Sequence, residues 1–346
     1  MRTIEICAGA GGQAIGLHMA GAEHVVLVEN DRHACETLEN NNRTHKLNWG
    51  EVICGDLEEF VEKQAESYRG QIDLVAGGVP CPPFSKAGKQ LGGDDERDLF
   101  PAALKLVEIV RPTAVMLENV PGLLEPKFAA YRKELKARLL SLGYESEWAE
   151  LQASDFGVSQ LRPRAVLVAL PKQYFPLFEW PEHSKEKPKS VGETLLDLME
   201  SKGWEGAANW ASLANDVAPT IVGGSKKHGG PDLGPTRAKR KWHSMHVNGH
   251  RIGKNDEVPD KSFRGVLSKD GTIREGHENM PLLTLRMVAR LQGFPDYWEF
   301  AGSKTHAYRQ IGNAFPPPVA EAVGRQIKSV LSKINVDTDY FVEAAE

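Results

Sequence analysis

The sequence contains no apolar stretch long enough to cross a membrane. Its longest uninterrupted apolar runs, such as residues 165–170, are far shorter than the roughly 18 to 20 residues that a membrane helix needs. The first residues, 1–5, include an acid that interrupts any apolar stretch, so they do not resemble a signal peptide. We therefore expect a soluble protein of the cytoplasm.

Cysteine is scarce as well. The four cysteines, Cys7, Cys35, Cys54 and Cys81, are widely spaced and form no C-x-x-C pair. This spacing indicates neither a zinc site nor a disulfide framework, so we expect no metal and consider each cysteine separately.

The chain has no overall excess of positive charge, and its net charge is -5. Between positions 226 and 254, however, eight Lys or Arg residues stand against one acid, so this segment carries +7 and the remainder of the chain carries -12. The average excludes a globally basic nucleic-acid binder, but the asymmetry predicts one face that binds a polyanion.

The first 170 residues repeat a pattern of short β-branched runs, each followed by a helical segment. The strands that we expect are residues 3–6, 25–29, 51–54, 72–76, 114–118 and 164–170. Such alternation predicts an α/β fold with a doubly wound, mostly parallel, Rossmann-like sheet. Ligands bind at the carboxyl ends of the strands in sheets of this kind.

The pattern changes at about residue 171. Up to about residue 283, Pro and Gly are dense, Trp and basic residues are interspersed, and no long periodic helix is evident. We predict a second, smaller, loop-rich domain in this region. Helical patterns return at residues 285–291 and 318–331.

A glycine-rich turn follows the first predicted strand, in Cys7-Ala8-Gly9-Ala10-Gly11-Gly12. Glycines let the backbone turn with positive φ and approach a ligand closely. Glu29 ends the second strand, where a carboxylate can accept hydrogen bonds from ribose hydroxyls, and Asp56-Leu57 after the third suits an adenine amino group and ring. The pattern predicts an adenosine site and fits nicotinamide dinucleotides and S-adenosylmethionine equally.

A thiol held between prolines follows the fourth predicted strand, in Pro80-Cys81-Pro82. Because proline fixes φ, this thiol is preorganised, and the segment that follows, residues 86–96, is rich in Gly, Lys and Asp. A nucleophile beneath a closing loop fits this arrangement. After the fifth strand comes Glu118-Asn119, and Arg162 and Arg164 share one face if the chain there is extended.

In their order along the chain, these segments resemble the cytosine-5 DNA methyltransferase family over residues 1 to about 325. The matching segments are Ala8-Gly9-Ala10-Gly11-Gly12 (cofactor loop), Pro80-Cys81 with Phe84-Ser85 (nucleophile loop), Glu118-Asn119-Val120 (base-binding strand end), Gln160-x-Arg162-x-Arg164 (paired arginines), residues 290–296 (the segment following the recognition domain) and residues 310–314 with 317–319 (closing segment). Cys7 stands where the family usually has an aromatic residue, and Pro82 stands where glutamine is common.

The resemblance implies covalent catalysis on a cytosine flipped out of the DNA duplex. The thiolate of Cys81 would add to C6, Glu118 would hold or protonate N3, and Arg162 and Arg164 would hold the base and the loop. C5 would then take the methyl group of S-adenosylmethionine, with S-adenosylhomocysteine as the product. Loss of the C5 proton would expel the thiol.

The resemblance also implies a set of binding residues. The expected cofactor-binding residues are Ala8, Gly9, Gly11, Gly12, Glu29, Asn30, Asp56, Leu57, Pro80, Leu99 and Asn313. The expected DNA-binding residues are Ser85, Lys86, Lys89, Gln90, Thr220, Lys226, Lys227, Arg237, Lys239 and Arg240. Most of these cations would contact phosphate, and one or two would reach guanine.

In this interpretation, residues 1–185 and 304–346 form a discontinuous catalytic and cofactor-binding domain, and residues 186–303 form the target-recognition domain. The protein would act on double-stranded DNA as a monomeric, nucleoid-associated bacterial modification enzyme. A cognate restriction endonuclease, if one exists, would act as a separate protein. Three alternatives are an RNA cytosine methyltransferase, a catalytically silent DNA-binding module and a nicotinamide oxidoreductase. Intact Cys81, Glu118 and both arginines disfavour the second, and the Pro80-Cys81 loop disfavours the third.

Overall fold

The computed structural model describes residues 1–80, 98–223 and 231–343. The chain forms two compact units. The first consists of Met1–Leu151, Pro163–Glu182 and Val319–Glu346, and the second of Gln152–Arg162 and His183–Pro318. The domain boundaries that we expect from the sequence, 185/186 and 303/304, stay predictions.

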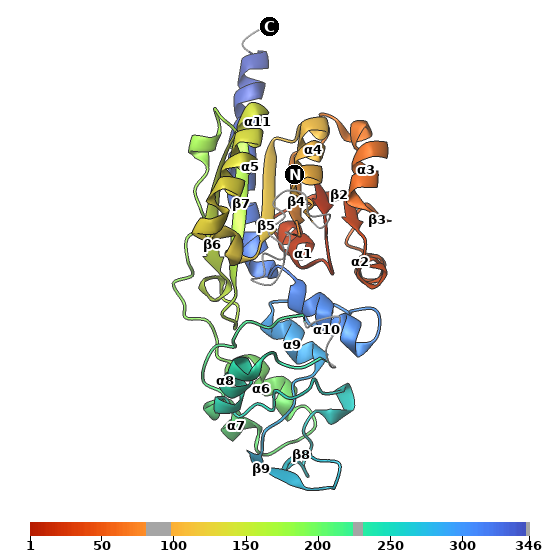
Figure 1. The fold of residues 1–346 in the computed structure, drawn as a ribbon, viewed down its shortest axis with the longest axis vertical. Helices are drawn as coiled ribbons and strands as arrows, with labels where there is room; N and C mark the ends of the chain where they lie inside the picture. The colour runs from red at the N-terminus through yellow and green to blue at the C-terminus, as the bar shows by residue number, and fades with distance from the viewer. Residues whose placement is uncertain (81–97, 224–230, 344–346) are drawn as a thin grey trace. The chain divides into compact units, whose positions relative to one another are not determined.

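The first unit is built on a seven-stranded sheet with the order β3-β2-β1-β4-β5-β7-β6 (Figure 1). Neighbouring strands from β3 to β5 run parallel, and β7 runs antiparallel to β5. This confirms the predicted α/β fold with a mostly parallel sheet. The strands are β1 (Arg2–Ile6), β2 (Glu23–Glu29), β3 (Glu51–Cys54), β4 (Leu74–Gly78), β5 (Ala114–Asn119), β6 (Tyr144–Gln152) and β7 (Pro163–Pro171).

Helices alternate with these strands, and the two central strands β4 and β5 are buried almost throughout. Strands covered on both faces carry continuous apolar runs, as in Ala114-Val115-Met116-Leu117. The helices are α1 (Gly12–Met19), α2 (Arg32–His45), α3 (Leu57–Lys63), α4 (Phe100–Val110), α5 (Ala129–Ser141) and α11 (Pro317–Glu343), with 3-10 turns at Ala65–Tyr68, Pro121–Leu124, Pro126–Phe128 and Phe175–Leu177.

Two features of the sheet differ from the sequence-based expectation. Strand β6 was missed, because its residues, YESEWAELQ, are rich in acids and are only partly buried at the end of the sheet. Strand β4 lies two residues later than predicted, so that Gly77 and Gly78 belong to the strand and not to the loop after it.

The second unit contains short helices and a two-stranded sheet. Its elements are α6 (Val191–Glu200), α7 (Ala207–Leu213), α8 (Thr236–Ser244), α9 (Leu285–Leu291), α10 (Lys304–Asn313), β8 (Gly265–Leu267) and β9 (Ile273–Glu278), with 3-10 turns at Ala153–Phe156 and Asn255–Glu257. Helix α9 has the predicted bounds. Helix α6 was not predicted, although a capping box, in which Ser190 and Glu193 bond each other's backbone N–H, marks its start. Trp210 and Trp242 are buried in this unit.

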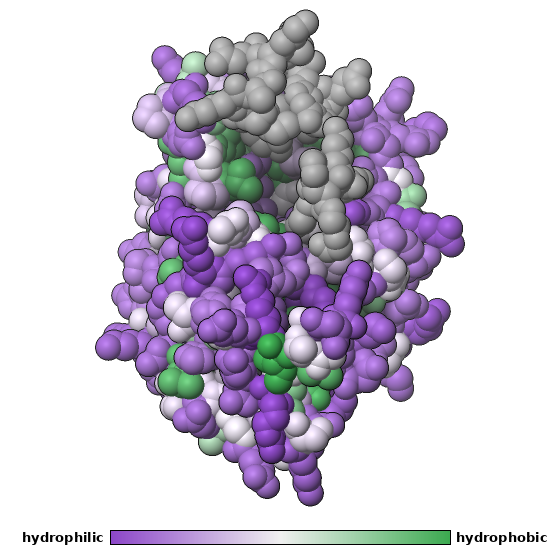
Figure 2. All heavy atoms as spheres, turned by 60° about the horizontal axis from the view of Figure 1, so that its bottom comes forward, coloured by the Kyte–Doolittle hydropathy of each residue, from purple (hydrophilic) through white to green (hydrophobic). Residues whose placement is uncertain are grey.

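None of the helices in the described residues is both long enough and apolar enough to span a membrane. The face shown in Figure 2 is mostly hydrophilic, with small separate apolar patches.

Candidate active site

The glycine-rich turn connects β1 to α1 through three residues with positive φ. Cys7, Gly9 and Gly11 have φ values of 49°, 55° and 85°, and Gly11 is the residue that precedes the first turn of α1. A left-handed conformation is strained for residues with a side chain, so glycine suits the last two positions.

Glu29 joins this turn to the carboxyl end of β2. Its Oε2 accepts a hydrogen bond from the Gly9 N–H at 2.7 Å, and its Oε1 accepts from the Asn30 and Asp31 N–H groups at 2.9 and 2.8 Å. Burial raises the pKa of the Glu29 carboxyl, and these three hydrogen bonds oppose that shift. Each carboxylate oxygen has two lone pairs, so Oε2 retains one for a ligand hydroxyl.

Asp56 lies at the carboxyl end of β3 and caps α3. Its Oδ1 accepts hydrogen bonds from the Glu58 and Glu59 N–H groups at 2.8 and 3.2 Å. The other carboxylate oxygen makes no hydrogen bond within the described part of the chain. Leu57 is only 3% exposed and packs in the hydrophobic core, so it offers little free surface to an adenine ring.

Cys7 lies close to both acids. Burial and the charges of Glu29 and Asp56 raise the pKa of its thiol above the usual value. Burial likewise raises the pKa of Cys35, whose Sγ donates a hydrogen bond to the Glu29 carbonyl oxygen at 3.3 Å. Both shifts favour the neutral thiol over the thiolate, so neither cysteine suits a nucleophilic role.

Glu118 and Arg164 form an ion pair at the carboxyl end of β5. Arg164 Nε lies 2.7 Å from Glu118 Oε1, and the two side chains are 9% and 10% exposed. The pair forms because β5 and β7 are antiparallel neighbours, with Glu118 opposite Val166. Burial lowers the pKa of Arg164, and the charge of Glu118 opposes the shift.

The second carboxylate oxygen of Glu118 lies beside Gly78, the last residue of β4. A Cβ at Gly78 would be 3.1 Å from Glu118 Oε2, closer than side chains usually approach. Glycine at this position therefore leaves space for the carboxylate at the point where the chain continues toward Pro80 and Cys81.

Asn119 fixes the same strand end, and the sequence alone did not single it out as a site residue. Its Nδ2 donates a hydrogen bond to the Val79 carbonyl at 2.7 Å, and its Oδ1 accepts one from the Val120 N–H at 2.7 Å. Asn119 therefore positions the backbone just before Pro80. The signal for it in the sequence was its place in Glu118-Asn119-Val120, the segment that resembles the family's base-binding strand end.

Arg162 belongs to the second unit and has different partners from Arg164. It is 1% exposed, and its guanidinium donates hydrogen bonds to the carbonyl oxygens of Ile221 (2.6 Å), Gly312 (2.6 Å) and Ala314 (3.0 Å). These contacts connect three segments that are distant in sequence. The expected role of Arg162 in holding the base stays a prediction.

Two buried glutamines extend this network. Gln160 Nε2 donates to Gln292 Oε1 at 2.6 Å, and Gln160 Oε1 accepts from the Ile221 N–H at 2.9 Å. Gln292 in turn donates to the Ala314 carbonyl at 2.8 Å. The segments singled out in the sequence at residues 160–164, 290–296 and 310–314 therefore meet through buried side chains.

The remaining predicted residues are distributed over both units. Ala8 and Gly12 are buried, Asn30 is exposed, and the Leu99 N–H donates to the Pro80 carbonyl at 3.5 Å. Asn313 ends α10 in the second unit. Ser85, Lys86, Lys89, Gln90, Lys226 and Lys227 lie outside the described residues, as does Cys81.

Among the expected DNA-binding residues in the described part, Arg237 and Arg240 are exposed on α8. Lys239 forms an ion pair with Asp232 at 2.7 Å. The Thr220 hydroxyl donates to the Leu161 carbonyl at 2.6 Å. A role for any of these residues in binding DNA stays a prediction.

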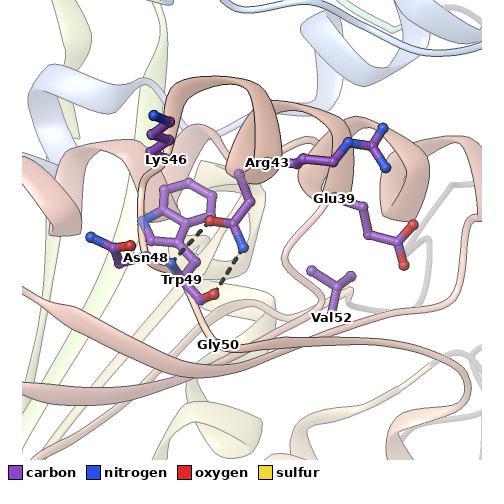
Figure 3. Close-up of a pocket in the computed structure, with 8 residues that line it drawn as sticks. Glu39, Arg43, Lys46, Asn48, Trp49, Gly50 and Val52 are labelled. Carbon is purple, nitrogen blue, oxygen red and sulfur yellow. Dashed lines mark hydrogen bonds between the residues drawn. The ribbon is translucent and has the colours of Figure 1, made fainter.

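One pocket in the first unit lies away from the predicted site (Figure 3). It has a volume of about 470 Å³ and is lined by the second half of α2, the segment that joins α2 to β3 and the start of β3, including Arg43, Lys46 and Val52. Trp49 is held there by two hydrogen bonds between its backbone and the Asn42 side chain. Since β3 begins at this pocket and ends at the predicted cofactor edge, the two are at opposite ends of the strand.

The match to a family model decides the family. Residues 1–329 match the model described as C-5 cytosine-specific DNA methylase. The chain belongs to this family. It is therefore an enzyme that acts on DNA, and the resemblance identified from the sequence is confirmed.

Curated relatives and solved structures agree with this assignment. The chain is 51% identical to the type II methyltransferase M.NaeI of Lentzea aerocolonigenes, over 99% of this chain and 78% of that protein. It is also 51% identical to the type II methyltransferase M.NgoMIV of Neisseria gonorrhoeae, over 96% of this chain and 99% of that protein.

Among solved structures, the methyltransferase EhMeth of Entamoeba histolytica matches with a TM-score of 0.64 and 16% identity, over 96% of this chain and 98% of that chain. The Dnmt2 methyltransferase of S. pombe matches with a TM-score of 0.59 and 17% identity, over 97% and 99%. Because the sequence identities are this low, the similarity to these two structures supports the fold of the chain and no more.

Proposed function

We propose that this enzyme transfers a methyl group from S-adenosylmethionine to C5 of a cytosine within a specific sequence of duplex DNA. The family and the two type II methyltransferases at 51% identity support this function. Such an enzyme would serve as the modification half of a restriction system, with the nuclease as a separate protein.

The residues at the carboxyl ends of β1, β2 and β3 fit the adenosine part of this methyl donor. The spare lone pair on Glu29 Oε2 can accept from a ribose hydroxyl, and the uncommitted oxygen of Asp56 can accept from the adenine amino group. The positive φ values of Gly9 and Gly11 let the backbone approach closely. When bound, S-adenosylmethionine supplies an electrophilic methyl group.

The chain's own residues would activate the cytosine. The Cys81 thiolate would add to C6, and Glu118 would hold or protonate N3, so that C5 becomes nucleophilic. C5 would then be able to take the methyl group that the bound donor supplies. Loss of the C5 proton to a base would leave its electron pair to form the C5=C6 double bond as the C6–S bond breaks, so that Cys81 would depart as the thiolate.

The observation that carries this proposal is the Glu118–Arg164 pair beside Gly78. It holds a buried carboxyl group at the strand end next to the one from which the Cys81 segment leaves. A carboxyl in such a place can hydrogen-bond the edge of a pyrimidine, which a simple helix cap would not do.

A mechanism-based trap tests the proposal. The protein is incubated with S-adenosylmethionine and duplex DNA that carries 5-fluorocytosine at candidate sites. Fluorine at C5 blocks the final elimination, so a covalent adduct that survives denaturation should form with wild type and not with Cys81→Ser. A wild-type enzyme that methylates ordinary DNA but never forms the adduct would refute covalent catalysis.

A further inference from the structure

A cavity of about 440 Å³ in the second unit has no role in the function described so far. It lies between α8, the segment at residues 247–250 and strand β9. Basic and imidazole side chains make up most of its lining, together with Thr236 at the start of α8.

The lining follows from local geometry. Thr236, Arg240 and His243 are spaced three and four residues apart, so they share one face of α8. Arg274 and His277 on β9 are three residues apart and would point to opposite faces of a regular strand. Gly276, with φ of 73°, interrupts the regular strand between them, and both line the cavity.

His277 is the central group. His277 is only 7% exposed, and its Nδ1 has no hydrogen-bond partner in the described part of the chain. Its ring centroid lies 5.1 Å from that of His243 and 5.7 Å from that of His250. A buried polar nitrogen without a partner is costly, which favours a ligand that supplies one.

The charges around His277 favour an anion. Arg240 and Arg274 form no ion pair within the described residues, whereas Lys239 is partnered by Asp232. Burial, Arg274, His243 and His250 lower the pKa of His277, and only Glu278 opposes them. No group of three or more His, Cys, Asp or Glu residues in the described part of the chain has the geometry to hold a metal.

We propose that this cavity binds one phosphate group of the DNA backbone, with Arg240 and Arg274 as the charged donors and the imidazole of His277 as the buried donor. The proposal rests on the proposed action on duplex DNA and names one of its contacts. Because a bound phosphate favours imidazolium over imidazole, binding would be tighter at pH values below the ordinary histidine range.

The first test uses inorganic phosphate alone, so that it does not depend on methyl transfer. The imidazole NMR signals are followed while phosphate is added to the full-length protein in the presence of EDTA. We expect the signals of His277 and His250 to shift in wild type and much less in Arg240→Gln. No shift at tens of millimolar phosphate, or shifts that appear only when Zn²⁺ replaces EDTA, would overturn the proposal.

The second test measures the affinity for duplex DNA against salt concentration. Arg240→Gln should weaken binding about tenfold at low salt and reduce the slope of log K against log[salt] by about 1. The control is Lys269→Gln, which removes an exposed cation between β8 and β9 that does not line the cavity and should leave both quantities unchanged. A loss in Arg240→Gln confined to one DNA sequence, with an unchanged slope, would indicate base contact and overturn the proposal.

The outcomes separate this proposal from the proposed function. A covalent adduct with 5-fluorocytosine and no response to phosphate would refute phosphate binding in the cavity and leave the proposed methyl transfer standing. A response to phosphate and the expected change of slope, without any adduct, would leave the phosphate site standing and remove the proposed chemistry.

Discussion

The two units satisfy their buried backbone groups in different ways. In the first, parallel strands pair their backbone groups with one another, and the main core cluster is apolar, with buried polar side chains such as Glu5 and His24 beside it. In the second, regular strands are few, and buried side chains such as Gln160, Arg162 and Gln292 bond backbone groups directly.

The difference bears on the role of the buried polar side chains in each unit. A buried carbonyl without a partner costs free energy, so irregular backbone needs side-chain donors where a sheet would supply N–H groups. The buried polar residues of the second unit that bond backbone groups are therefore expected to serve stability, whereas Glu118, Asn119 and Arg164 gather at a strand end of the first unit, where chemistry is expected.

The largest effect that we expect is on the rate of methyl transfer when Glu118, at the strand end of the first unit, is replaced. Glu118→Gln keeps the size of the side chain but removes the acid, so the rate of methyl transfer should fall by about 10² to 10⁴-fold. Single-turnover methylation at saturating DNA measures this. Binding of S-adenosylmethionine should change less than twofold, because the expected cofactor residues are on other strands, and a turnover within threefold of wild type would contradict the role of Glu118.

Arg162 provides the matching test in the second unit. Arg162→Ala leaves the carbonyls of Ile221, Gly312 and Ala314 without their donor and should lower the free energy of unfolding by about 3 to 5 kcal/mol. Urea unfolding followed by tryptophan fluorescence measures the loss, and Arg162→Lys should restore part of it. If Arg162→Ala remains as stable as wild type but is inactive, Arg162 serves chemistry and the contrast fails.

Asn119 should show a smaller effect on both properties. Asn119→Asp keeps the acceptor for the Val120 N–H but cannot donate to the Val79 carbonyl, so we expect a loss of about 1 to 3 kcal/mol in stability. Methyl transfer should also fall, since the backbone before Pro80 is no longer fixed. Thermal unfolding and single-turnover rates on the same sample check this, and unchanged rates would remove the positioning role.

The smallest effect concerns the pH dependence of an ion pair near the surface of the second unit. Arg251 holds the pKa of Glu257 at about 2, so its contribution to stability is present above the unfolded pKa and is lost as the pH falls toward 2. Glu257→Gln should therefore lower the unfolding free energy at pH 7 by at most about 1 kcal/mol, with no difference from wild type near pH 2. Urea unfolding at several pH values tests this, and a difference that grows on acidification would contradict it.

Much of the first unit was predictable because its signals are local. Apolar runs such as residues 114–117 mark buried strands, and Glu29, Asp56 and Glu118 stand at their carboxyl ends, where the fold places ligands. Strand β6 was not predictable in this way, because at the end of the sheet its acids remain partly exposed and its pattern is no longer apolar.

The partners of the polar side chains were not predictable. Arg162 and Arg164 are two positions apart, and the sequence favoured a common role for them. In the structure, Arg164 pairs with Glu118 across two strands, whereas Arg162 bonds carbonyls up to 152 positions away. Asn119 carries no pattern of its own, and its role appears only from its bond to Val79.

The order of residues by itself determined the α/β fold and the strand ends at which Glu29, Asp56 and Glu118 stand, because hydrophobic periodicity and turn residues act over a few positions. The family was evident from motifs that resemble it. The tertiary structure decided which guanidinium reaches the carboxylate, which carbonyls depend on Arg162, and that His243, His250 and His277 meet around one cavity. Such contacts join residues far apart in the chain, so they depend on how the segments pack and not on any local pattern.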